Sequence, residues 1–161
     1  EFGPRALGAR SILANPADPA VHDELNRRLD RTEFMPFAPA VEADEAARIF
    51  DINLGCAYTS RFMTLPCSVR PAWRSAIPAA VHVDGTARPQ VVDPHNSPML
   101  TRVLRAFYGI TGVPVLINTS FNVHEEPIVE SSHDCVRALS QGRIDAVLTD
   151  DGLYRRRGTA A

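Results

Sequence analysis

Apolar positions recur at helical spacing in several stretches of the chain and form continuous runs in others. The helical pattern predicts four helices, over 19–29, 42–50, 98–111 and 132–141. The pairs Asp18-Pro19 and Ser97-Pro98 are typical of helix starts, and Gly112 and Gly142 are typical of helix ends.

The remaining apolar stretches predict strands. Continuous runs over 113–117 and 144–148 indicate buried strands, and the extended segment 31–39 (RTEFMPFAP) contains two prolines and should lead into a strand at 38–41. Loose alternation over 58–69 predicts a further strand. The ranges 79–83 and 89–92 read as a hairpin about a turn at 84–86. The arginines at 155–157 read as a solvated basic tail.

Helices alternate with strands late in the chain and mix with a hairpin in its middle. This order predicts the α/β class, with α+β as the alternative, and a mixed twisted sheet flanked by helices. The chain has 161 residues, 45% apolar and 22% charged, which fits a single globular domain over 1–161. Because it starts inside a motif and without Met, we interpret it as a fragment of a larger protein.

The charge and cysteine content exclude some classes of function. The net charge of -2 argues against a general nucleic-acid coat. All 17 basic residues are arginine, so neither a Schiff-base lysine nor a P-loop lysine is possible within this sequence. Three widely spaced cysteines indicate reduced thiols rather than a disulfide framework or zinc site, and no long apolar span occurs. These features favour a cytoplasmic protein with no membrane partner.

Two short blocks carry the candidate chemistry. Arg5 and Arg10 lie among glycines and a proline at the start of the chain, where backbone N–H groups can approach a ligand. Guanidinium groups match the oxygens of phosphates and carboxylates. The block Asn118 to Asn122 (NTSFN) places two amides and two hydroxyls directly behind a predicted buried strand. Together the blocks indicate an enzyme that handles an anionic, phosphorylated small molecule.

The chain resembles the C-terminal domain of the nodulation- and antibiotic-type O-carbamoyltransferases. The resemblance rests on four blocks in the family's order: 1–13 (EFGPRALGARSIL), 31–39 (RTEFMPFAP), 81–90 (VHVDGTARPQ) and 115–129 (VLINTSFNVHEEPIV). It implies a YrdC-like domain that uses ATP, with Mg²⁺, and carbamoyl phosphate to build carbamoyl adenylate. A preceding Kae1-like domain of the same chain, which carries the metal, would then move the carbamoyl group to a hydroxyl of a sugar-like acceptor. The fragment alone is not expected to complete this transfer.

The same resemblance assigns the site. Arg5 and Arg88 fall on anion-binding arginines, and Asn118, Ser120 and Asn122 fall on the polar cluster around the carbamoyl group and nucleotide. Arg10 is a further ligand-binding candidate, and no protein-held metal is expected in this part. Many members carry a lysine and an arginine about the RTEFMPFAP segment, whereas this chain has Leu29 and Met35 there. Arg28 and Arg31 are both close enough in sequence to replace them.

Other interpretations stay open at this stage. The side chains of Asn118 and Asn122 can instead cap a loop by bonding to its backbone. Arg88 can be a solvated hairpin residue and His82 a packed structural histidine. Two other functions compete as well. One is a tRNA-modifying YrdC relative that makes threonylcarbamoyl adenylate, against which the charge and absent lysine count. The other is a non-catalytic nucleotide-binding or docking domain, slightly favoured by Leu29 and Met35.

Overall fold

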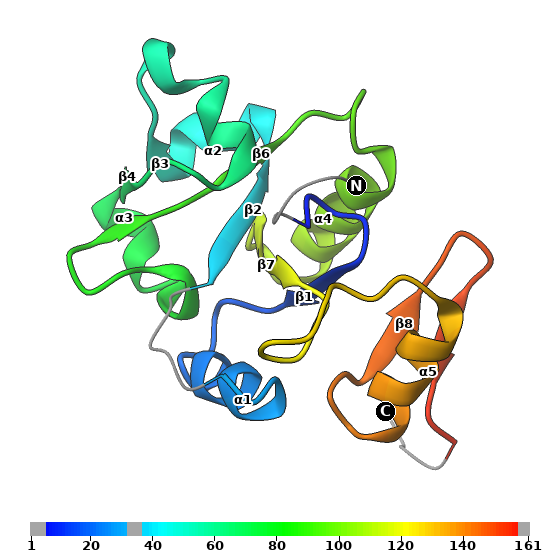
Figure 1. Cartoon of the computed structure of the whole chain (residues 1–161). Coiled ribbons are helices and arrows are strands. Elements are labelled where there is room, and N and C mark those ends of the chain that lie inside the picture. Colours follow the sequence, from blue (N-terminus) through cyan, green and yellow to red (C-terminus); the bar gives the residue numbers. More distant parts are fainter. Residues whose placement is uncertain (1–5, 32–36, 158–161) are drawn as a thin grey trace.

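A mixed four-stranded sheet organises the chain (Figure 1), and the computed structural model describes residues 6–31 and 37–157. The strand order is β1 (Ser11–Ala14), β7 (Val115–Ser120), β2 (Ala38–Glu42) and β6 (Gln90–Val92). Strand β7 is antiparallel to β1 and β2, while β2 and β6 are parallel. The predicted fold class, α/β with a mixed sheet flanked by helices, is confirmed.

One end of this sheet gathers segments that lie far apart in the sequence. Ser11 pairs with Ser120, Ala38 with Asn118, and Ala40 with Gln90. Strands β1, β2 and β6 therefore begin at the same end at which β7 finishes. We call it the Ser120 end of the sheet.

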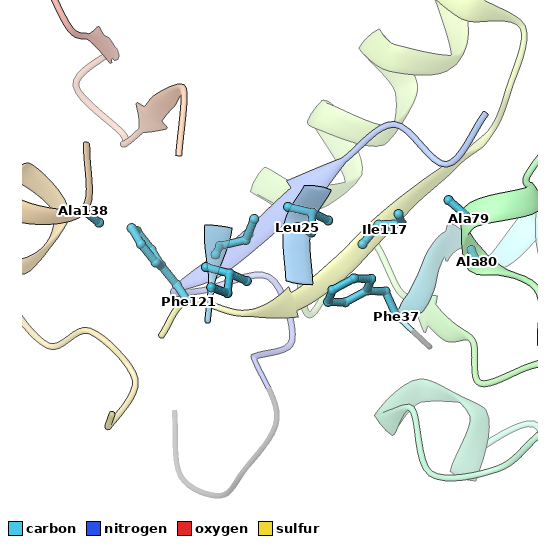
Figure 2. Close-up of a cluster of buried hydrophobic side chains, with 9 residues drawn as sticks. Leu25, Phe37, Ala79, Ala80, Ile117, Phe121 and Ala138 are labelled. Atoms are coloured by element: carbon cyan, nitrogen blue, oxygen red, sulfur yellow. The ribbon is translucent and has the colours of Figure 1, made fainter. Parts of the chain in front are cut away.

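Helices cover the two faces of the sheet, and alternation along β7 decides which residue meets which helix. Leu116 packs with Leu100 and Leu104 of α4 (Pro98–Thr111). Ile117 points to the opposite face, into the cluster that contains Leu25 of α1 (Ala20–Arg28), as Figure 2 shows. Because successive strand residues face opposite sides, a strand between two helical layers is expected to be apolar on both sides, as Val115–Ile117 of β7 is.

A second group of elements lies beside the sheet at the upper left of Figure 1. It contains α2 (Ala43–Ile49), α3 (Pro71–Arg74) and a small antiparallel sheet of β3 (Phe50–Asp51), β4 (Cys67–Val69) and β5 (Thr86–Ala87). Three single-turn 3₁₀ helices connect them, over Leu54–Cys56, Thr59–Phe62 and Pro78–Ala80.

The C-terminal part consists of α5 (Ser132–Ser140) and a hairpin of β8 (Ala146–Leu148) and β9 (Leu153–Arg155). Ala138 of α5 joins the same buried cluster as Phe121, which directly follows β7 (Figure 2). The end of β7 is thus fixed against α5 as well as against β1.

The predicted helices are confirmed, and their capping chemistry explains their bounds. The Asp18 carboxylate accepts a hydrogen bond from the Ala20 backbone N–H at 2.9 Å, one residue from the expected start. Ser131 and Asp134 form a capping box at the start of α5. Gly112 ends α4 with a φ of 72°, a conformation that glycine adopts without a side-chain clash.

Several strand predictions are wrong in their bounds, their partners or their burial. Within 58–69 only Cys67–Val69 is a strand, and Thr59–Phe62 is a 3₁₀ helix. The turn at 84–86 exists, but no hairpin joins 79–83 to 89–92, because Gln90–Val92 pairs with β2 in another sheet. The strand near 144–148 is not buried, since Leu148 is half-exposed in a two-stranded hairpin. The expected basic tail begins inside β9.

The main sheet also contains strand residues that the pattern did not indicate. β7 continues through Ser120, past the expected end at 117, and β1 was not predicted at all. β1 pairs with this added part of β7, Ser11 with Ser120 and Leu13 with Asn118. The polar residues 118–120 form a strand because β1 supplies partners for their backbone hydrogen bonds.

Candidate functional site

The Ser120 end of the sheet brings together the described parts of the four sequence blocks. Residues 6–10 precede β1, Phe37 precedes β2, Arg88 lies two residues before β6, and Ser120 ends β7. Arg5, Met35 and their neighbours at 1–5 and 32–36 lie outside the described residues. The strand order explains the convergence, because three strand starts and one strand end share this edge.

Arg31 reaches into this end from the segment after α1. Its guanidinium donates to the Thr119 hydroxyl at 3.1 Å and lies 3.5 Å from the Ser120 hydroxyl. It also lies over the Phe37 ring, 5.4 Å from the centroid. Burial lowers the pKa of Arg31, and among residues 6–31 and 37–157 no carboxylate lies within ion-pair distance of it. A half-buried cation without an opposite charge is suited to bind an anion.

Arg28 is in a different situation, although it lies only three residues earlier. Its guanidinium bonds to Glu24 at 2.6 Å and to Asp145 at 2.8 Å, and these hydrogen bonds raise the pKa of Arg28. Leu29 is 1% exposed in the apolar cluster of Figure 2. Of the two arginines that the sequence offered as replacements, Arg31 is the one directed at the Ser120 end.

Ser120 and Asn122 meet, and Asn122 is held by its own loop. The Ser120 hydroxyl donates to Asn122 Oδ1 at 2.5 Å, and Asn122 Nδ2 donates to the carbonyls of Val123 and Glu126, each at 3.0 Å. The backbone N–H of His124 donates to the Leu29 carbonyl at 2.9 Å, which ties the loop to the end of α1. Asn122 therefore takes the loop-capping arrangement that the sequence left open as an alternative.

Asn118 does not join that pair. Its side chain is 1% exposed, and its Nδ2 donates to Gln90 Oε1 at 2.5 Å. Gln90 Nε2 in turn donates to the Leu7 carbonyl at 2.8 Å. The two amides meet across β2, where the residues opposite them are Ala38 and Ala40, whose small side chains leave room for the contact. Gln90 and Thr119 stand inside the sequence blocks 81–90 and 115–129, but no local signal marks either of them individually as a site residue.

The two other arginine candidates flank the same end. The Arg10 backbone carbonyl accepts from the Phe121 N–H at 2.9 Å, and its side chain lies 3.4 Å from the Val129 carbonyl. Arg88 Nη1 lies 3.5 Å from the Met63 carbonyl. His82 bonds through Nδ1 to the Thr86 hydroxyl at 2.9 Å. Burial, followed by the charge of Arg88, lowers the pKa of His82.

Two pockets border these residues. One, of about 390 Å³, is lined by Leu7, Ala9, Gln90 and the residues directly before α4. The other, of about 350 Å³, lies between the loop after β7 and α5 and includes Asn122 and Arg137. Within the described part of the chain, no cluster of three or more His, Cys, Asp or Glu side chains is arranged to hold a metal ion.

Comparison with known proteins assigns the family. The family described as "Carbamoyltransferase C-terminus" matches residues 1–156. The chain belongs to this family. It is a C-terminal domain of the type found in the NolO and NodU nodulation proteins. Nodulation protein NolO of Bradyrhizobium diazoefficiens is 39% identical over 158 residues, which cover 98% of this chain and 29% of NolO. Nodulation protein U of Rhizobium tropici is 38% identical over 160 residues, 99% of this chain and 27% of that protein.

A third similar protein comes from Methanocaldococcus jannaschii. An uncharacterized protein of Methanocaldococcus jannaschii is 39% identical over 158 residues, 98% of this chain and 25% of its own length. The carbamoyltransferase C-terminal domain thus spans about a quarter of the relatives that it matches. In the described ranges, no helix combines the length and apolar character that a membrane crossing requires.

Proposed function

We propose that this domain binds carbamoyl phosphate and ATP, with Mg²⁺, and forms carbamoyl adenylate within a longer carbamoyltransferase. Membership of the family supports the reaction class. The observation that carries the proposal is Arg31, a half-buried cation at the end of the sheet where the four blocks meet, which among the described residues faces hydroxyls rather than a carboxylate. Such a group gains most from an anionic ligand.

The proposed reaction has three steps. Water converts carbamoyl phosphate into carbamate and phosphate. A carbamate oxygen then attacks the α-phosphorus of ATP, the bond to the β-phosphate oxygen breaks, and pyrophosphate leaves. The acceptor hydroxyl finally attacks the carbamoyl carbon, AMP leaves, and the hydroxyl proton is released. In-line displacement at phosphorus needs alignment and charge neutralisation, which arginines and Mg²⁺-bound ATP supply without a covalent nucleophile.

The site residues divide between the two substrates. Arg5 and Arg88 are proposed for the phosphate of carbamoyl phosphate, and Asn118 for its planar carbamoyl group. Arg31 is proposed for the phosphates of ATP, in place of the basic residues that many family members carry where this chain has Leu29 and Met35. Ser120, Asn122 and Arg10 shape the loop beside it. A Kae1-like domain of the same polypeptide would carry out the transfer to a sugar-like hydroxyl, in the cytoplasm.

Titration calorimetry with the full-length polypeptide tests the proposal. Carbamoyl phosphate and ATP should each bind, and together they should release pyrophosphate, while tRNA should not bind. Pyrophosphate release that needs threonine in addition would favour the tRNA-modifying alternative. ATP binding without any pyrophosphate release would favour a non-catalytic nucleotide-binding domain. Either result would overturn the proposal.

A further inference from the structure

A chain of hydrogen bonds fixes the orientation of two buried amides at the Ser120 end. A backbone carbonyl only accepts, so Gln90 must turn Nε2 toward Leu7, which accepts at 2.8 Å. Gln90 Oε1 then faces Asn118 and needs a donor there, so Asn118 must present Nδ2, which donates at 2.5 Å. The carbonyl of Leu7 thereby determines which way the amide of Asn118 points.

This orientation leaves Asn118 Oδ1 without a donor. The oxygen is buried, and no hydrogen-bond donor reaches it from any of the residues that the structure describes. An unsatisfied buried acceptor is unfavourable, and native proteins keep very few of them. A donor group of a bound ligand would satisfy Asn118 Oδ1. Such a ligand would have to bring an N–H or O–H group to this end of the sheet.

We propose that Gln90 is a positioning residue that holds Asn118 Oδ1 toward the amino group of the carbamoyl ligand, so that the site selects carbamoyl phosphate over acetyl phosphate. This inference rests on the proposed function. The two compounds share a phosphate and a planar carbonyl and differ in one group, NH₂ against CH₃. The NH₂ group can donate to Asn118 Oδ1, whereas the CH₃ group leaves that oxygen unpaired.

The discrimination follows from the burial of the acceptor. A site built around a hydrogen bond rejects an analogue that lacks the matching donor more strongly than an apolar pocket rejects a change in size. If Gln90 were replaced by an apolar side chain, the Asn118 amide could turn over and present its NH₂ group instead. The preference for the carbamoyl group should then be lost.

The experiment measures the affinities of both compounds on the same preparation of the full-length polypeptide. In the unmodified protein, carbamoyl phosphate should bind at least about tenfold more tightly than acetyl phosphate, the size expected for one buried hydrogen bond. Gln90→Met, which keeps the length of the side chain, should bring the two affinities to within about threefold. Gln141→Met is the matched control, because Gln141 is exposed after α5 and should leave the ratio unchanged.

A ratio of affinities separates positioning from general damage. If Gln90 only stabilises the fold, Gln90→Met weakens the binding of both compounds by the same factor. The ratio of affinities is then unchanged, which refutes the positioning role of Gln90 while the proposed function stands. If the unmodified protein binds no carbamoyl phosphate, the proposed function fails and this inference with it.

Asn118→Leu keeps the test decisive if Gln90→Met does not fold. It removes the acceptor itself and should abolish the preference, and an undiminished preference would refute the inference. Where both variants fold, adding Gln90→Met to Asn118→Leu should not change the ratio further, because the two side chains act through one hydrogen bond. An independent, additive effect of Gln90→Met on the ratio would refute the proposal that Gln90 acts through Asn118.

Discussion

Replacement of Arg31 by methionine tests the assignment of the anion site most directly. The variant keeps an unbranched apolar stem beside the Phe37 ring but removes the charge and the donors that face Thr119 and Ser120. Loss of one charged, partly buried phosphate contact should weaken ATP binding by about 2–4 kcal/mol, or about 30- to 700-fold. Carbamoyl phosphate binding should change less, because Arg31 is proposed for the nucleotide.

Stability, unlike ATP affinity, should hardly change in the Arg31→Met variant. Methionine at position 31 cannot form the hydrogen bond of 3.1 Å to Thr119 or the marginal bond of 3.5 Å to Ser120. The absence of these bonds is offset by removing a cation that burial destabilises, as the lowered pKa of Arg31 indicates. The free energy of unfolding should therefore stay within about 1 kcal/mol of the unmodified value. Thermal melting beside the calorimetry measures this.

Arg28→Met supplies the matched control three residues away. Its guanidinium is engaged by Glu24 and Asp145, so its loss should lower stability by about 0.5–1 kcal/mol and leave ATP affinity nearly unchanged. If Arg31→Met binds ATP as tightly as the unmodified protein, or if both variants lose the same affinity, the assignment of Arg31 is wrong.

Three further predictions concern stability. Asn122→Ala removes bonds to two loop carbonyls and to Ser120, so it should cost about 1–2 kcal/mol and lower the melting temperature by several degrees; an unchanged melting temperature would contradict the loop-capping role. Ser131→Ala breaks the capping box of α5 and should cost about 1 kcal/mol in denaturant titration, whereas Ser140→Ala, at the other end of α5, should cost less. The pKa of His82 is lowered by burial, so the unfolded chain binds its proton more readily, and stability should fall as the pH drops below about 6.5. His82→Asn should flatten melting temperature against pH between about 7.5 and 5.5, a window above the titration of the carboxylates; an equal slope in both proteins would exclude His82 as the cause.

Much of the fold was available from local patterns. The helices α1, α4 and α5 were predicted because apolar spacing, capping residues and glycine stops act within a few residues of one another. Continuous apolar runs likewise predicted the buried part of β7. Strand partners were not predicted, since Gln90–Val92 reads as one arm of a local hairpin until β2 is seen to be its partner. Pairing between distant segments leaves no signal in either segment alone.

The candidate site, like the fold, could be predicted only in part from the sequence. The sequence by itself determined the chemical groups, namely arginines without lysine, the amides and hydroxyls of 118–122, and the family to which the blocks belong. Only the tertiary structure decided which of these groups act together. It pairs Arg28 with Glu24 and Asp145, directs Arg31 at Thr119, and joins Asn118 to Gln90. The physical reason is that burial and counter-charge depend on the strand order, which brings four separated segments to one end of the sheet.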